Sequence, residues 1–344
     1  MRKLTIKGQI RDCTLLIGEH LQNASQYIPH DKTVVITDAN VRNYFQKDFP
    51  AGDIISIGTG EVIKNLDTVK DLYGRLVELR ADRSTFVLGI GGGVVCDICG
   101  FVASTYMRGV RFAYIPTTLL AQVDAGVGGK TGVNLGGYKN LVGVFNQPEF
   151  VLCDFNLLRT LPRAEMLSGF AEIVKHAVIA EERLFEFIEH NYEKAIELDS
   201  AIIEKLVYES LVIKSTVVNT DETEKGERRK LNFGHTFGHA IEKETGVTHG
   251  EAISVGMVMA SALSVEKGFL TEAEHRRLKT LLGKIGLPAR MPVNIESVPD
   301  ALEKDKKREG EAVHFVMLNG IGKAIVVEIS LTELKDSMRN WIRT

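Results

Sequence analysis

Thr85-Phe-Val-Leu-Gly-Ile-Gly-Gly-Gly-Val-Val-Cys-Asp97 joins a predicted strand to a predicted helix through three consecutive glycines. The apolar run before the glycines is typical of a buried strand, and Val94 to Met107 is typical of a helix. Glycines at such a turn let the backbone approach a phosphate, and the helix N-terminus offers free N–H groups and a favourable dipole. The turn therefore favours pyrophosphate binding, although Val94 stands where the common dinucleotide fingerprint GxGxxG requires glycine.

Strand-like and helical stretches alternate on both sides of this turn. Asn65 to Arg80 has helical spacing, and four more β-branched runs predict strands at Thr33–Thr37, Ile54–Ile57, Phe112–Ile115 and Phe150–Cys153. This alternation predicts an α/β domain over residues 1–155, with a mainly parallel sheet covered by helices on both faces. Ligands of such sheets bind at the carboxyl ends of the strands, where the glycine turn falls.

The pattern changes after Pro162. From there to about residue 290, apolar residues recur at helical spacing, as in Leu198 to Val218, and strand-like runs disappear. Near the end, Val313 to Ile329 predicts a hairpin, and a closing helix is expected from about Leu331 to Ile342. A second, mostly α-helical domain is therefore predicted over residues 156–344, and we expect the two domains to share a cleft.

Composition excludes several classes of protein. The formal net charge is −3, without the basic excess that a dedicated nucleic-acid binder shows. No apolar run approaches the roughly 18 residues that span a bilayer, and the first residues have no apolar core like that of a secretory signal. Cys96 and Cys99 fall on the predicted apolar helix, where we expect buried thiols rather than a zinc or redox site. The expected location is a reducing cytoplasm.

A second glycine cluster, Gly126-Val-Gly-Gly-Lys-Thr-Gly132, is not a phosphate-binding P-loop. It lacks the GxxxxGK[ST] spacing, because Asp124 stands where the first glycine is required. We therefore predict a mobile loop that brings Asp124 and Lys130 to a substrate.

Histidines and a carboxylate recur at spacings that suit a metal site. His235 and His239 fall four residues apart on one face of a predicted helix, and His249 follows near the start of the next helix. Upstream, Glu172 and His176 fall on one stripe of another predicted helix. Two histidines and one carboxylate, with a fourth position open to water or substrate, form the ligand set of a catalytic zinc site. The sequence leaves open Glu172 or His176, and His235 or His239, as ligands.

Several cations lie in or beside these motifs. A compact dianionic substrate would explain them, because arginine holds a carboxylate through two hydrogen bonds and lysine acts as a point charge on phosphate. The residues are Lys130, Lys139, Lys175, Lys214, Arg228 and the pair Lys306-Lys307.

Taken in order along the chain, the motifs resemble the 3-dehydroquinate synthase family. No single motif is specific, but the combination is, and it extends from about residue 30 to about residue 310. The motifs are Gly89-Ile-Gly-Gly-Gly-Val-Val-Cys-Asp97, Ile115-Pro-Thr-Thr-Leu-Leu-Ala-Gln-Val-Asp124, Gly128-Gly-Lys-Thr-Gly-Val-Asn134, Leu161-Pro162, Gly169-Phe-Ala-Glu172, Asp221-Glu-Thr-Glu224, Leu231-Asn-Phe-Gly-His-Thr-Phe-Gly-His239 and His249-Gly-Glu251.

The resemblance implies a fold, a reaction and an assembly. Members combine an N-terminal dinucleotide-binding α/β domain with a helical C-terminal domain, and their active site lies between the two. They convert 3-deoxy-D-arabino-heptulosonate 7-phosphate to 3-dehydroquinate and phosphate in the shikimate pathway, using NAD and one divalent ion, zinc or cobalt. The reaction of the family proceeds by transient oxidation, β-elimination of phosphate, re-reduction, ring opening and aldol closure. A homodimer is implied, in which Arg108 reaches into the neighbouring subunit.

The resemblance also implies roles for individual residues. The metal ligands would be Glu172, His235 and His249, while His239 would help to bind the substrate phosphate and His176 would be structural. The residues around NAD would be Asp38, Asn40, Glu61, Lys64, Gly91, Gly92, Gly93, Asp97, Thr117, Thr118, Lys130 and Lys139. The catalytic and substrate-binding set would add Asp124, Asn140, Lys175, Lys214, Glu224, Arg228, Asn232 and one of the pair Lys306-Lys307, with Lys306 preferred.

Three other functions compete with this one. A metal-dependent alcohol or glycerol dehydrogenase shares the fold and the glycine turn but has no use for a cationic substrate pocket. A sister sugar-phosphate cyclase acting on sedoheptulose 7-phosphate, which lacks the carboxylate, is disfavoured by Arg228 and Asn232. A non-catalytic NAD- or metal-binding regulatory module would not need the whole set of residues.

Overall fold

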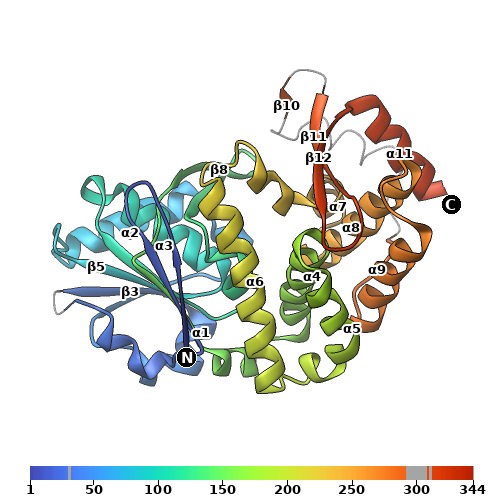
Figure 1. Cartoon of the computed structure of the whole chain (residues 1–344). Coiled ribbons are helices and arrows are strands. Elements are labelled where there is room, and N and C mark those ends of the chain that lie inside the picture. Colours follow the sequence, from blue (N-terminus) through green and yellow to red (C-terminus); the bar gives the residue numbers. More distant parts are fainter. Residues whose placement is uncertain (30–31, 292–307, 310–311, 344) are drawn as a thin grey trace. The chain divides into compact units, whose positions relative to one another are not determined.

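The computed structural model describes residues 1–29, 32–291, 308–309 and 312–343 (Figure 1). The chain divides into two compact units: Met1–Leu161 with Lys214–Glu222 form the first, and Pro162–Ile213 with Thr223–Thr344 form the second. None of the helices in the described part of the chain combines the length and the apolar character that a bilayer crossing needs.

A seven-stranded sheet organises the first unit. Its strands are β1 (Arg2–Ile6), β2 (Cys13–Ile17), β3 (Thr33–Asp38), β4 (Asp53–Ile57), β5 (Phe86–Gly91), β6 (Arg111–Pro116) and β9 (Phe150–Cys153). They follow the order β1-β2-β9-β6-β5-β3-β4, and every neighbouring pair is parallel except β1 and β2. The five predicted strands and the mainly parallel sheet are confirmed, whereas β1 and β2 were not predicted.

Helices cover both faces of this sheet. α2 (Leu66–Glu78) and α3 (Gly93–Thr105) lie on one face and α1 (Ala39–Phe45) on the other, as right-handed crossovers along this strand order require (Figure 1). β3 and β5 are almost continuously apolar and buried, as strands covered on both faces should be. The two predicted helices are confirmed as α2 and α3, and Cys96 and Cys99 are buried free thiols on α3, as expected.

The second glycine cluster is a loop over residues 126–129 and a strand from Lys130 onward, so the predicted loop is wrong for Lys130 to Gly132. Lys130 begins β7 (Lys130–Leu135), which pairs antiparallel with β8 (Tyr138–Phe145), and Asp124 lies in the short π-helical turn η5 (Ala121–Ala125). Gly132 in this cluster permits close strand pairing, because a Cβ on it would lie 2.7 Å from the backbone oxygen of Val142 on the facing strand. Composition alone does not distinguish glycine that permits close strand pairing from glycine in a mobile loop.

Helices form most of the second unit. They are α4 (Arg163–Ala180), α5 (Glu182–Ile196), α6 (Ser200–Thr220), α7 (His235–Thr245), α8 (His249–Glu266), α9 (Glu272–Ile285) and α11 (Leu331–Arg343), and α6 belongs to the first unit from Lys214 onward. A small antiparallel sheet follows the order β10 (Arg308–Glu309), β11 (Ala312–Leu318) and β12 (Ala324–Ser330). The mostly helical character, the hairpin of β11 and β12 and the closing helix α11 are confirmed predictions.

Candidate active site

Helix α4 carries ionisable groups through the interior of the second unit. All of its residues from Ser168 to Ile179 are buried. Glu172, with no exposed surface, forms an ion pair with Lys175, which lies one turn later and is 1% exposed. A buried carboxylate is costly unless charges or hydrogen bonds compensate it. Glu172 therefore marks a place that accommodates positive charge.

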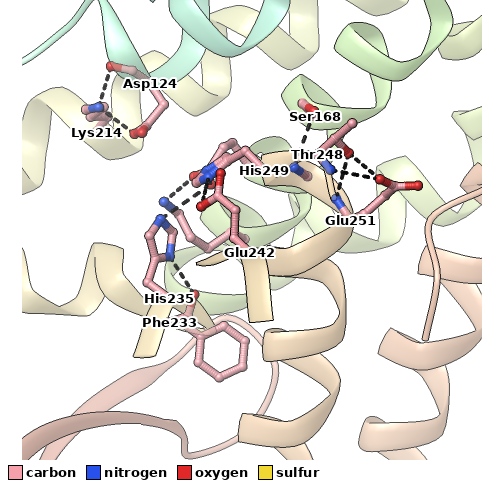
Figure 2. A network of polar contacts seen from close by, with 12 residues as sticks. Asp124, Ser168, Lys214, Phe233, His235, Glu242, Thr248, His249 and Glu251 are labelled. Atoms are coloured by element: carbon pink, nitrogen blue, oxygen red, sulfur yellow. Dashed lines mark hydrogen bonds and ion pairs between the residues drawn. The ribbon is translucent and has the colours of Figure 1, made fainter. Parts of the chain in front are cut away.

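Two histidine rings from other helices converge on Glu172. His235 begins α7 and His249 begins α8 (Figure 2). Their Nε2 atoms lie 3.6 Å and 3.3 Å from Glu172 Oε1. The centroids of the two rings are 5.7 Å apart. One donor atom from each of the three residues lies within 4.8 Å of the others. Two imidazoles and one carboxylate at this spacing can hold a divalent cation.

The second nitrogen of each ring faces a different acceptor. His235 Nδ1 lies 3.1 Å from the backbone oxygen of Phe233, and His249 Nδ1 lies 3.7 Å from Glu242 Oε2 (Figure 2). Glu242 was not singled out from the sequence. The available signal was its spacing on α7, because His235, His239 and Glu242 stand at positions i, i+4 and i+7 of one helical face.

The pKa values of the two histidines move in opposite directions. Burial, followed by the positive charge of Lys175, holds the pKa of His235 well below its usual value, so its ring is neutral. Burial also lowers the pKa of His249, but the neighbouring carboxylates of Glu172 and Glu242 outweigh this effect and raise the pKa to about 9. The negative charge of the two carboxylates stabilises the proton on His249, and the same charge would stabilise a metal cation.

The start of α8 is fixed by its own sequence. Thr248 is the N-cap and forms a capping box with Glu251, whose Oε2 accepts the backbone N–H of Thr248 at 3.0 Å (Figure 2). Gly250 lets this end of the helix approach α4, because a Cβ there would lie 2.4 Å from the Cα of Ser168. These contacts place the ring of His249 beside Glu172.

The two alternatives that the sequence left open occupy distinct positions. His176, one turn beyond Glu172 on α4, is completely buried. The ring of His239 stands edge-on to that of His235, with centroids 5.1 Å apart. His239, Glu242 and His249 form a second group of donor atoms within 4.8 Å of one another.

The ends of three neighbouring parallel strands carry predicted cofactor residues. The turn Gly91–Gly93 joins β5 to α3, and Thr117 and Thr118 follow β6 directly. Asp38 ends β3 and caps α1 by accepting the N–H of Asn40 at 2.9 Å. Because β6, β5 and β3 are adjacent in the sheet, these residues line one edge of it. This edge has the form of a dinucleotide site, with a free helix N-terminus at α3.

Two further predicted cofactor residues pair with each other. Lys64 and Asp97 form a largely buried ion pair. Burial by itself would lower the pKa of Lys64, but Asp97 and Glu61 raise it above its usual value, so Lys64 stays charged. Glu61 also accepts a hydrogen bond of 2.8 Å from the amide of Asn134.

The first unit also contains predicted substrate residues. Lys214, 90 positions after Asp124, donates to both the backbone oxygen and the carboxylate of that residue (Figure 2). Lys130 and Lys139 are exposed on β7 and β8, and Asn140 has a left-handed backbone with φ 50°. The structure therefore brings Asp124 and Lys214 together.

Three predicted substrate residues of the second unit lie in or near the short 3-10 helix η7 (Glu227–Asn232). Arg228 is only 2% exposed, and the amide of Asn232 donates to Glu224 Oε1. A buried guanidinium suits an anion that it can hold through two hydrogen bonds.

Arg108 is exposed at a turn with three consecutive positive φ angles. The angles are 50° at Met107, 69° at Arg108 and 115° at Gly109. Left-handed backbone costs roughly 1–2 kcal/mol for a residue other than glycine, so this turn is held in place by its surroundings. The remaining predicted residues, Lys306 and Lys307, lie outside the described residues.

Comparisons with known proteins agree over most of the chain. A family model described as 3-dehydroquinate synthase N-terminal matches residues 54–168, and one described as 3-dehydroquinate synthase C-terminal matches residues 169–308. A 3-dehydroquinate synthase from Acetivibrio thermocellus is 43% identical over 312 residues, which cover 88% of this chain and 86% of the relative.

Solved structures of two related enzymes have the same fold. A 2-deoxy-scyllo-inosose synthase, complexed with carbaglucose-6-phosphate, NAD+ and Co2+, is 30% identical with a TM-score of 0.89, covering 98% of this chain and 100% of that one. A 2-epi-5-epi-valiolone synthase from Streptomyces hygroscopicus, with NAD+ and Zn2+ bound, is 26% identical with a TM-score of 0.89, covering 100% and 99%.

Proposed function

The chain belongs to the 3-dehydroquinate synthase family, and we propose that its own residues serve that reaction as follows. Its function is to convert 3-deoxy-D-arabino-heptulosonate 7-phosphate to 3-dehydroquinate and phosphate. It is a phosphate-eliminating lyase of the shikimate pathway that uses NAD and a divalent metal ion. The observation that carries the residue assignment is the convergence of His235 and His249 on the buried carboxylate of Glu172.

Glu172, His235 and His249 are the proposed metal ligands. One carboxylate and two imidazoles suit zinc or cobalt and leave a coordination position for the substrate. Bound there, the ion would polarise the C5 hydroxyl of the substrate. The ion pair between Glu172 and Lys175, and the neutral ring of His235, keep this donor set ready for a cation.

The proposed cofactor site is the edge formed by the ends of β3, β5 and β6. Bound there, NAD would take a hydride from C5 and later return it. The N-terminus of α3 supplies free N–H groups for the pyrophosphate. We assign Asp38, Asn40, Glu61, Lys64, Gly91, Gly92, Gly93, Asp97, Thr117, Thr118, Lys130 and Lys139 to this site.

The proposed substrate residues divide by the group that they hold. We assign the substrate carboxylate to Arg228, helped by Lys139 and Asn140. The phosphate is assigned to Lys130, Asn232, His239 and one of the pair Lys306-Lys307. Asp124, Lys175, Lys214 and Glu224 complete the set. Once C5 is a ketone, the C6 proton is acidic and phosphate leaves by β-elimination, so the main task of these residues is to hold the geometry.

We further propose a homodimer in a reducing cytoplasm. The exposed, left-handed turn at Arg108 supports a role for this side chain in a neighbouring subunit, because strained backbone of this kind is often functional. The four cysteines support the location, since all of them are buried free thiols.

Removing the metal should stop phosphate release, and adding Zn2+ or Co2+ should restore it. In the metal-free protein the pKa of His249 is about 9, so below that pH the incoming ion must displace one proton. His235 is already neutral and adds no further proton. The apparent metal affinity should therefore rise about tenfold per pH unit between about pH 7 and pH 9. Equilibrium dialysis with Co2+ measures this slope, and an affinity independent of pH would contradict His249 as a ligand.

A further inference from the structure

His249 has a carboxylate at each ring nitrogen. Its Nε2 lies 3.3 Å from Glu172 Oε1 and its Nδ1 lies 3.7 Å from Glu242 Oε2. The Glu242 side chain is 11% exposed, so its charge is poorly screened by water. Glu242 belongs to none of the sets of residues assigned above to metal, cofactor or substrate.

Each of the two proposed histidine ligands has an oxygen near Nδ1, at hydrogen-bond distance for His235 and at the longer ion-pair distance for His249. His235 Nδ1 faces the backbone oxygen of Phe233 at 3.1 Å, while its Nε2 faces Glu172. A neutral imidazole carries its proton on one nitrogen only, so an acceptor at Nδ1 leaves the lone pair on Nε2 free to bind a metal. Phe233 provides this acceptor for His235, and Glu242 provides it for His249.

The rings of His235 and His249 differ in exposure, and therefore in how far other residues must fix their orientation. Both histidines begin a helix, but the side chain of His235 is 10% exposed whereas that of His249 is 27% exposed. The more exposed ring has fewer protein contacts that fix its orientation. His249 therefore depends more on an outside contact for its orientation, and Glu242, on α7, supplies one.

We propose that Glu242 is a positioning residue for the metal. Its carboxylate accepts the Nδ1–H of His249, fixes the tautomer with Nε2 directed to the ion, and offsets part of the ion's charge. This inference rests on the proposed metal site. Carboxylates that orient a histidine ligand in this way typically change metal affinity by about 10- to 100-fold when they are removed.

A direct metal contact is the competing role for Glu242. Donor atoms of His239, Glu242 and His249 also lie within 4.8 Å of one another. That group, however, would use His249 Nδ1 and leave the fully buried Glu172 outside the coordination sphere. The group around Glu172 brings the ion to a fully buried carboxylate that has Nε2 atoms of two histidines beside it, so we assign the ion to this group.

The test compares Glu242→Gln and Glu242→Ala with Glu244→Gln. Glu244 is an exposed residue of the same helix, so its change gives the same loss of charge away from the histidines. Each protein is titrated with Co2+ by equilibrium dialysis at several pH values up to about 9, because loss of Glu242 also removes one cause of the raised pKa of His249 and so reduces proton competition at lower pH. The affinities are compared near pH 9, where this competition is small, and the d–d absorption of the cobalt-loaded form is recorded. We expect Co2+ to bind about tenfold more weakly to Glu242→Gln and up to about 100-fold more weakly to Glu242→Ala, with an unchanged cobalt spectrum. Glu244→Gln should match the unmodified protein.

Three results would overturn the inference, and each has a different meaning. Affinities within about twofold of the unmodified protein, with only the thermal stability of the metal-free form reduced, would make Glu242 merely structural. A cobalt d–d spectrum that differs between the Glu242→Gln protein and the unmodified protein would show a change in the coordination of the ion, and would make Glu242 a ligand. Absence of Co2+ binding by the unmodified protein would remove the proposed metal site itself, and the role of Glu242 with it.

Discussion

Purified Glu172→Ala, His235→Ala and His249→Ala proteins should contain no metal and should lose nearly all of their turnover. Each substitution removes one of only three proposed protein ligands, whose donor atoms lie within 4.8 Å of one another. Polarisation of a substrate oxygen by a metal contributes several kcal/mol of transition-state stabilisation. Its loss should lower turnover by about a thousandfold or more. Elemental analysis and phosphate release measure the two effects, and circular dichroism checks that each variant is folded.

His239→Ala is the matched control for this series. His239 lies on the same helix face as His235, and it belongs to the second group of donor atoms. We expect this variant to lose turnover, because a contact with the substrate phosphate is gone, but to retain its metal. A metal-free His239→Ala protein beside a metal-replete His249→Ala protein would reverse the assignment of ligands.

Arg228→Ala should remove the preference for a carboxylated substrate. Arg228 is 2% exposed, and a buried guanidinium is unfavourable when its anion is missing. Breaking or mispairing a buried charged contact costs roughly 3–5 kcal/mol, and each ~1.4 kcal/mol is tenfold in rate. The unmodified enzyme should therefore process sedoheptulose 7-phosphate at least about a hundredfold worse than the carboxylated sugar. Arg228→Ala should reduce this difference in kcat/KM between the two sugars, chiefly by losing activity on the carboxylated sugar.

Values of kcat/KM for both sugars decide this prediction. Arg229→Ala is a suitable control, because it removes the neighbouring guanidinium from the same short helix and should leave the preference intact. Arg228→Lys keeps the charge but loses the paired hydrogen bonds, so it should recover only part of the preference. Comparable values for the two sugars in the unmodified enzyme would show that the carboxylate is not recognised, and would favour the sister cyclase.

The sequence predicted the central part of the fold because that part is locally encoded. The β-branched runs around Gly91–Gly93 are buried on both faces, so they are apolar throughout and easy to recognise. β1 escaped prediction because it is a mostly exposed edge strand whose residues alternate little. β7 escaped prediction because Gly132 permits close strand pairing, a property that depends on the facing strand rather than on the segment itself.

The sequence predicts a metal site made of histidines and a carboxylate, but it does not decide which of the candidate residues are the ligands. Helical spacing puts His235 and His239 on one face, so spacing alone does not choose between them. In the structure the choice depends on α4 and α8, which bring Glu172 and His249 to the ring of His235. The contact of Glu242 with His249 Nδ1 depends in the same way on how α7 packs against α8, which no local pattern reveals.

One assay that follows phosphate and NADH together distinguishes the cyclase from a dehydrogenase. The metal-loaded enzyme is given NAD and a known amount of 3-deoxy-D-arabino-heptulosonate 7-phosphate, and both products are followed until the sugar is consumed. Because the hydride leaves and returns within one cycle, we predict one phosphate released for each sugar consumed and no net accumulation of NADH. NADH that accumulates in step with the sugar consumed would contradict this function and would indicate a metal-dependent dehydrogenase.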